Sequence, residues 1–126
     1  MNDRSHRRSH PRGREAEEFA AIYLRAHGYR IRETNVRFRG GEIDIVAEDG
    51  ATLAFVEVRA RRPSVYGGPE ESIGTLKQQR MHRAAEEYLA RHHADADRPS
   101  RIDVVAIELD RNGRPASVDL IRNALE

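Results

Sequence analysis

The alternation of hydrophobic and polar residues is most regular between residues 41 and 59, on either side of Asp49-Gly50. Successive side chains of a β-strand point to opposite faces, so an alternating segment predicts a strand with one buried face. Two such strands follow each other here closely enough to form a hairpin. One face of the predicted hairpin carries only apolar side chains: Ile43, Ile45, Ala47, Ala54, Val56 and Val58.

The other face of the predicted hairpin carries acidic residues and an arginine. Asp49-Gly50 accepts the positive φ angles of a two-residue loop. With this loop, Glu42 lies opposite Glu57, and Asp44 is a diagonal neighbour of Glu57 on the same face. Arg59 follows Glu57 on that face. We therefore expect three carboxylates and a guanidinium to share one surface.

The rest of the chain shows helix and strand patterns that complete an α/β fold. We predict a helix over 14–27 ended by Gly28, a strand over 29–38, a second helix from Ser72 or Thr75 to about His92, and strands over 101–109 and 117–121. Thr75 and Gln78 have the spacing of a capping box at the start of the second helix. With the hairpin, the order is αβββαββ, which predicts an α/β sandwich: one mixed β-sheet flanked by helices.

Three charged residues lie where the apolar pattern predicts burial. Lys77 falls on the apolar stripe of the second helix, between Ile73 and Met81. Either its stem packs while the ammonium stays in water, or the ammonium reaches an anion or carboxylate inside the fold. Glu17 borders the apolar side of the first helix, where simple solvation is the alternative to a functional role. Asp103 shares its strand face with apolar residues, so we expect it to be exposed or paired with an arginine.

Length and composition limit the class of protein. The 126 residues, 34% charged and 38% hydrophobic, predict a single domain over 14–122 and a disordered basic arm over 1–13. The absence of cysteine excludes disulfides and thiolate metal sites. No apolar run approaches the length of a membrane span, and the N-terminus has no apolar signal core. We therefore expect a cytoplasmic protein without a membrane partner.

Basic residues are concentrated on both sides of the acidic hairpin, although the formal net charge is only +1. The candidates for nucleic-acid contacts are Arg37, Arg39, Arg61, Arg62 and Arg80. Lys77 is the only lysine among 22 basic residues, which indicates a coding bias toward arginine and weakens the argument for any one arginine. For the arm over 1–13, the alternative to phosphate binding is a floppy terminus. The glycine-rich loop over 64–71 is a candidate substrate lid.

Acidic residues paired in this way are typical ligands of hard divalent cations. Two carboxylates within about 5 Å repel each other when ionised, and a cation removes that repulsion. Mg²⁺ prefers oxygen ligands and is often held by one or two carboxylates together with substrate phosphates. Asp44 and Glu57, with Glu42 as a secondary ligand, therefore form a candidate Mg²⁺ or Mn²⁺ site. The alternative is a set of solvated acids, because many exposed hairpins carry two or three.

Segments spread over about residues 14–109 together resemble one family. They are Ala16-Glu17 with Ala20 and Tyr23-Leu24, Asn35 with Arg37, Gly41-Glu42-Ile43-Asp44-Ile45-Val46-Ala47, Phe55-Val56-Glu57-Val58-Arg59-Ala60-Arg61, Gly67-Gly68 with Glu71-Ser72-Ile73, Lys77 with Arg80, Ala84-Ala85 with Tyr88-Leu89, and Arg101-Ile102-Asp103-Val104-Val105-Ala106. This pattern resembles the YraN family of bacterial proteins. Its hairpin also resembles the core of the restriction-endonuclease-like, PD-(D/E)XK superfamily, and the fold of the family is similar to that of archaeal Holliday-junction resolvases.

The resemblance implies a metal-dependent endonuclease-like domain. It assigns metal binding to Glu17, Asp44 and Glu57, and it expects a lysine where this chain has Arg59. Arginine keeps the charge, but it does not readily release a proton or take the compact position of an ammonium. The superfamily sometimes supplies its cationic residue from the neighbouring helix, which makes Lys77 the candidate to replace that lysine.

Three functions follow from these observations. The first is a Mg²⁺- or Mn²⁺-dependent endonuclease acting on branched or otherwise structured DNA, with Asp44, Glu57, Arg59 and Lys77 as catalytic residues. The second is a nucleic-acid-binding module of the same fold without hydrolysis, which Arg59 favours. The third is a protein-interaction adaptor with a solvated acidic hairpin. A homodimer would suit a two-fold DNA substrate such as a junction.

Overall fold

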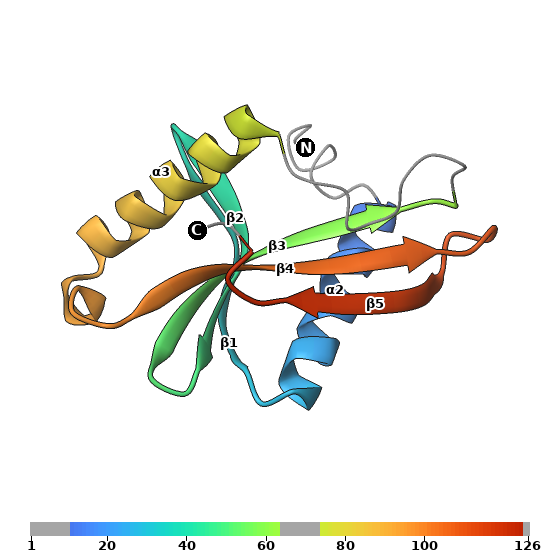
Figure 1. The fold of residues 1–126 in the computed structure, drawn as a ribbon, viewed down its shortest axis with the longest axis horizontal. Helices are drawn as coiled ribbons and strands as arrows, with labels where there is room; N and C mark the ends of the chain where they lie inside the picture. Colours follow the sequence, from blue (N-terminus) through green and yellow to red (C-terminus); the bar gives the residue numbers. More distant parts are fainter. Residues whose placement is uncertain (1–10, 64–73, 125–126) are drawn as a thin grey trace, which may run out of the picture.

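The computed structural model describes residues 11–63 and 74–124, and it confirms the predicted order of elements (Figure 1). The elements are α2 (Pro11–Ala26), β1 (Arg30–Phe38), β2 (Gly41–Asp49), β3 (Thr52–Arg61), α3 (Thr75–Arg91), the short 3-10 helix η1 (His93–Asp95), β4 (Ser100–Leu109) and β5 (Pro115–Ile121). Residues 1–10 of the predicted arm and the predicted lid over 64–71 lie outside the described residues.

One mixed β-sheet organises the molecule. Its strands follow the order β1-β2-β3-β4-β5. β3 and β4 run parallel, and the other neighbouring pairs are antiparallel. A parallel pair needs a long crossover connection, and α3 lies in the chain between β3 and β4. The fold is therefore the mixed α/β sheet of order αβββαββ that the sequence predicts.

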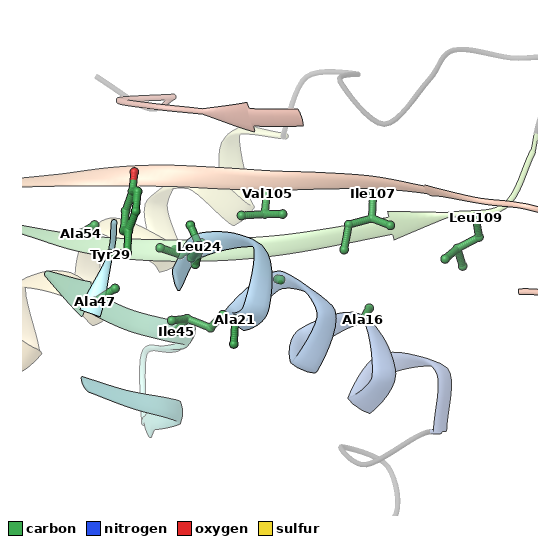
Figure 2. Close-up of a cluster of buried hydrophobic side chains, with 12 residues drawn as sticks. Ala16, Ala21, Leu24, Tyr29, Ile45, Ala47, Ala54, Val105, Ile107 and Leu109 are labelled. Carbon is green, nitrogen blue, oxygen red and sulfur yellow. The ribbon is translucent and has the colours of Figure 1, made fainter. Parts of the chain in front are cut away.

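α2 covers one face of this sheet, and the alanines on its inner side let it lie close to the strands (Figure 2). Figure 2 shows Leu24 near Ala54, and Ala16 toward the Leu109 end of β4. The buried cluster on this face consists of Ala16, Ala20, Ala21, Leu24, Tyr29, Ile45, Ala47, Ala54, Val56, Val105, Ile107 and Leu109.

α3 covers the opposite face, so both faces of the hairpin are buried over most of their length. The cluster beneath α3 consists of Ile43, Val46, Leu53, Phe55, Met81, Ala84, Ala85, Tyr88 and Ile102. The prediction of one core face and one mixed face is therefore wrong for most of the hairpin. Ile43, expected on the face of Ile45, packs in the α3 cluster instead. Central strands covered on both faces read as continuous apolar runs, and β3 has this pattern from Leu53 to Val56.

The register of the hairpin differs from the prediction by two positions. Asp49 pairs with Thr52, so the loop residues are Gly50 and Ala51. Gly50 has a φ of 64°, and a glycine with positive φ at the first loop position is typical of a type II′ turn. The predicted loop would have required a positive φ at Asp49, and Asp49 does not adopt one.

This difference changes which acidic residues are neighbours. A shift of two positions keeps every side chain on its own face. Continued beyond the last paired residues of β2 and β3, the observed register places Asp44 directly opposite Glu57, where the prediction made them diagonal neighbours. Glu42 does not lie opposite Glu57 as predicted; it pairs with Arg37 of β1.

The first helix begins earlier than predicted, whereas α3 begins at Thr75, one of its two predicted starts. α2 begins at Pro11, before the expected start at Arg14, and proline suits the first turn because its fixed φ and missing N–H cost nothing there. At the start of α3, Gly74 is the N-cap and no side chain caps the helix. The capping box predicted for Thr75 and Gln78 therefore does not form, and the Gln78 N–H donates to the Gly74 carbonyl oxygen at 3.0 Å.

Asp103 is fully buried and paired, which is one of the two outcomes predicted for it. Its carboxylate accepts hydrogen bonds from Arg101 Nε at 2.8 Å, from the Tyr29 hydroxyl at 2.9 Å and from the Asn123 N–H at 2.8 Å. The last bond ties the segment after β5 to the middle of the sheet. Asp103 therefore stabilises the fold away from the acidic hairpin face.

Candidate functional site

A cleft of about 320 Å³ opens where the beginning of β2 faces α3. Its lining combines three acids, four cations and four other residues: Glu42, Asp44, Glu57, Arg37, Arg39, Lys77, Arg80, Phe38, Gly40, Gly41 and Met81. The structure thus brings into one hollow most of the residues predicted for metal binding, catalysis and nucleic-acid contacts.

The end of the β2–β3 ladder creates the acidic part of this cleft. Backbone pairing of the two strands stops at Ile45 and Val56. Beyond this point the Val58 N–H donates to Oδ2 of Asp44 at 2.8 Å instead of to a backbone carbonyl. The Asp44 carboxylate is thereby held between the strands, beside Glu57.

Burial raises the pKa of the Asp44 carboxyl well above its usual range. The negative charge of Glu57 raises this pKa further, and that of Glu17 adds to it, whereas the hydrogen bond from the Val58 N–H acts in the opposite direction. The hydrogen bond from the Val58 N–H therefore does not compensate the repulsion between the Asp44 and Glu57 carboxylates. A cation at the two carboxylates would balance it.

Lys77 supplies a cation at this position from α3. Its Nζ lies 2.6 Å from Oε2 of Glu57, whose side chain is only 9% exposed, while 52% of the Lys77 side chain is exposed. The hypothesis that the Lys77 ammonium reaches a carboxylate within the fold is therefore confirmed. The apolar stripe that contains Lys77 also behaves as predicted, because Met81, Ala84 and Tyr88 are buried.

Gly41 sets the distance between β2 and α3. A Cβ at this position would lie 2.5 Å from the carbonyl oxygen of Arg80 and 3.1 Å from its carbonyl carbon. No other residue type fits without a backbone shift, because both contacts are with main-chain atoms. The glycine therefore permits the close approach of α3 that brings Lys77 over Glu57.

The remaining predicted residues lie outside the cleft. Glu17 lines a separate groove on α2 together with Thr34 and Asn35, although its charge is felt at Asp44. Arg59 is partly buried on β3, and Arg61 ends that strand; neither lines the cleft. Arg62 is exposed just after β3. Of the five arginines predicted to contact nucleic acid, Arg37, Arg39 and Arg80 are thus the ones that the cleft gathers.

Two cleft residues, Phe38 and Met81, were not predicted as part of a site. Met81 could have been found from the helical spacing that relates it to Lys77. Phe38 could not, because a partly buried aromatic residue at the end of a strand is a common packing feature.

The donor set fits a hard divalent cation, although not through protein ligands alone. Within residues 11–63 and 74–124, no three His, Asp or Glu side chains are gathered as a ligand group for a metal ion. Asp44 and Glu57 offer carboxylate oxygens in the same cleft, and Glu42 lies at its exposed side. Mg²⁺ commonly takes one or two protein carboxylates and completes its shell with water and phosphate oxygens.

The fold and the cleft define a class: an α/β protein with a five-stranded mixed sheet, a helix on each face, and a carboxylate pair that a helix lysine contacts. The chain belongs to the family described as "Uncharacterised protein family UPF0102", the YraN family, whose model matches residues 16–107.

Individual relatives match nearly the whole chain. The UPF0102 protein of Symbiobacterium thermophilum is 48% identical over 112 residues, which cover 89% of this chain and 93% of the relative. The UPF0102 protein of Syntrophus aciditrophicus is 44% identical over 90% of this chain and 87% of its own length. That of Pseudomonas aeruginosa strain PAO1 is 41% identical over 100% of this chain and 99% of its own length.

Neither helix in the described part of the chain combines the length and the apolar character that crossing a membrane requires.

Proposed function

We propose that the chain is a Mg²⁺- or Mn²⁺-dependent endonuclease that hydrolyses phosphodiester bonds in DNA at the cleft between β2 and α3. The observation that carries this proposal is the meeting of Asp44, Glu57 and Lys77, with the Lys77 Nζ 2.6 Å from Oε2 of Glu57. Two carboxylates and an ammonium are the groups needed to hold a divalent ion and to face a phosphate.

Asp44 and Glu57 would hold the ion, and Glu42 would be a secondary ligand. Burial and the charge of Glu57 raise the pKa of Asp44, which means that its ionised carboxylate is unfavourable in the empty site. A bound cation would relieve this repulsion, so the carboxylate pair favours cation binding. The bound ion would lower the pKa of a water molecule and neutralise charge on the scissile phosphate. Glu17, outside the cleft, would act through its charge on Asp44.

Lys77 provides the positive charge that hydrolysis needs beside the phosphate. Hydrolysis forms a bond from water oxygen to phosphorus and breaks the bond to the leaving oxygen, with a proton passing from the water to the leaving group. Lys77 can stabilise the additional negative charge on the phosphate in this step. Its flexible stem and compact ammonium suit this role better than the guanidinium of Arg59, which does not line the cleft.

Arg37, Arg39 and Arg80 would bind the flanking phosphates of the DNA. They stand at the cleft beside the acids, and such contacts supply most of the sequence-independent affinity for nucleic acid. Branched or otherwise structured DNA is the substrate that the resemblance to Holliday-junction resolvases favours, and a homodimer in the cytoplasm would suit it.

The test is incubation of the chain with linear duplex, flap, single-stranded and junction DNA in Mn²⁺ or Mg²⁺. We expect cleavage by the parent and none by Asp44→Asn. The matched control is Asp119→Asn, an exposed acid on β5, which should cleave like the parent. If the parent cleaves none of these DNAs with either ion, hydrolysis is excluded.

A second candidate function is a nucleic-acid-binding module of the same fold that does not hydrolyse. The specific observation in its favour is Arg59, which stands where the superfamily has its lysine. Under this function, binding of DNA would depend on Arg37, Arg39 and Arg80, while addition of a divalent ion would produce no cleavage. A protein-interaction adaptor, the third sequence hypothesis, would instead show neither metal binding nor DNA binding.

A further inference from the structure

The cleft that contains Asp44 and Glu57 continues into a second hollow along α3. This hollow measures about 340 Å³, and it shares Phe38 and Gly40 with the first. Arg83 and Ala90 of α3 also line it. The two hollows therefore adjoin at Phe38 and Gly40, and we refer to them together as the channel along α3.

We propose that this channel takes one strand of nucleic acid, with an unpaired base against Phe38, and that the substrate of the carboxylate site is therefore a single-stranded segment rather than a closed duplex. The inference rests on the proposed function, and it names the class of substrate that the same site accepts.

Cations follow the channel along α3. Lys77 and Arg80, and likewise Arg80 and Arg83, are three residues apart, so each pair occupies neighbouring positions on the helix surface. Arg83 lies over Gly40, where a Cβ would be 3.5 Å from the Arg83 Cδ. Within residues 11–63 and 74–124, Arg80 and Arg83 form no ion pair, so their guanidinium groups are available to phosphates.

Two acids at the far end of the second hollow mark where the basic path ends. Glu86 and Glu87 both line it. Arg91 Nε donates to Oε2 of Glu87 at 2.7 Å, so part of this negative charge is compensated. The positively charged part of the channel therefore extends from Lys77 to Arg83. Its length suits a short segment of nucleic-acid backbone.

Phe38 is the feature that distinguishes single strands from duplexes. It is partly buried, packs against the α3 cluster and lines both hollows. The Arg91 guanidinium lies 5.4 Å from its ring centroid. An unpaired base can displace this guanidinium and stack on the ring, whereas the bases of a closed duplex are stacked on one another and face inward.

The depth of the carboxylates also favours a single strand. The Glu57 side chain is only 9% exposed, so a phosphate must enter the cleft to reach it. An unpaired strand has the backbone freedom to do so, and Phe38 lines the same cleft, where it can contact a base.

The test measures binding without hydrolysis, by fluorescence anisotropy of the full chain in the presence of a chelator. The probes are a fluorescein-labelled oligothymidine and a blunt duplex of the same length. We expect the single strand to bind at least about tenfold more tightly than the duplex. Phe38→Leu should weaken single-strand binding about tenfold and leave duplex binding unchanged, while Phe38→Tyr should retain it.

Arg83→Gln provides a surface variant that does not disturb the core. It should weaken single-strand binding and reduce the slope of log affinity against log salt by about one phosphate contact. Its matched control is Arg111→Gln, an exposed arginine in the turn between β4 and β5, which should bind like the parent. Equal affinity for single strand and duplex, or an equal effect of Phe38→Leu on both, would overturn the proposal.

The cleavage assay separates this inference from the proposed function. Preferential single-strand binding without cleavage of any DNA supports the channel and removes hydrolysis. Cleavage of a blunt duplex as fast as of a single strand overturns the channel and leaves hydrolysis in place.

Discussion

The ammonium of Lys77 contacts the carboxylate of Glu57 at 2.6 Å, although the two residues belong to α3 and to β3. This contact joins the helix on one face of the sheet to the acidic end of the central hairpin. It places the only lysine of the chain where the acids need a counter-charge.

Lys77 is expected to be needed for hydrolysis. Lys77→Ala should lower the rate of metal-dependent DNA cleavage about 100-fold, the usual effect of removing one group that stabilises transition-state charge. Arg59→Ala should change it much less, because Arg59 does not line the cleft. Cleavage rates of the two variants and the parent on the same DNA provide the measurement. If Lys77→Ala cuts as well as the parent, Lys77 has a structural role only.

Mn²⁺ is expected to stabilise the folded chain through the carboxylate pair. A ligand that binds only the folded state at 100 times its Kd adds about 2.7 kcal/mol to the free energy of unfolding. The parent should therefore show a higher Tm in Mn²⁺ and a heat of binding in calorimetric titration, and Asp44→Asn should show neither. Asp119→Asn is the control and should respond like the parent. No heat with the parent would count against a metal site.

Gly41→Ala is expected to destabilise the fold and to displace α3. The new Cβ would lie 2.5 Å from the Arg80 carbonyl oxygen, so the backbone must shift, at a cost of about 1 to 3 kcal/mol. Gly74→Ala is the matched control, because a Cβ there meets no atom within 4 Å and its φ is −64°. Urea unfolding of both variants tests the difference. Equal free energies of unfolding for the two variants would show that β2 and α3 separate without cost.

The buried carboxylate of Asp103 is expected to be the most sensitive position outside the cleft. Asp103→Ala removes the acceptor of three hydrogen bonds and leaves Arg101 partly buried without this partner, which should cost about 3 kcal/mol. Thermal unfolding measures the loss. Asp110→Ala, in the turn after β4, should have a smaller effect, and a comparable effect of both would contradict the special role of Asp103.

The stability contributed by Asp95 is expected to depend on pH. Hydrogen bonds from Arg32 at 2.9 and 3.1 Å hold the pKa of the Asp95 carboxyl below its usual range, and Arg98 adds to this. A lowered folded-state pKa stabilises the fold above the unfolded-state pKa, and this contribution is lost as the pH falls through the folded-state pKa.

Asp95→Asn should therefore lower the free energy of unfolding by about 1 kcal/mol at pH ~7, and by less at a pH below the unfolded-state pKa of about 3.9. Urea unfolding at the two pH values checks this. Asp97→Asn, an exposed neighbour, serves as the control. A loss that stays the same at low pH would show that the Asp95 charge is not the cause.

Much of the architecture was predictable because it depends on local periodicity. The order αβββαββ, the hairpin and the buried stripe of α3 all follow from alternation or helical spacing over short segments. The candidate acids Asp44 and Glu57 were found in the same way, since alternation along each strand of the hairpin places both side chains on one face. Pairing of Asp103 with an arginine was one of its two expected outcomes, because a fully buried carboxylate requires a cation or hydrogen-bond donors.

The errors have a common physical origin in interactions that the local pattern does not contain. The loop was placed at Asp49-Gly50, but Gly50 takes the first loop position and the register shifts by two. Asp-Gly satisfies the requirements of one turn type and Gly-Ala those of another, so the choice depends on how the strands pack. Ile43 was expected to pack on the face of Ile45, and it packs in the α3 cluster instead.

The sequence by itself determined the elements, the buried stripe of α3 and the identity of the acidic pair, because these depend on local patterns in the chain. Only the tertiary structure decided that Asp44 and Glu57 meet at the end of the β2–β3 ladder, that Lys77 and not Arg59 lines the cleft, and that Phe38 borders both hollows beside α3. These relationships depend on how closely α3 approaches β2. That approach is set at Gly41, where main-chain atoms of two distant segments leave no room for a side chain.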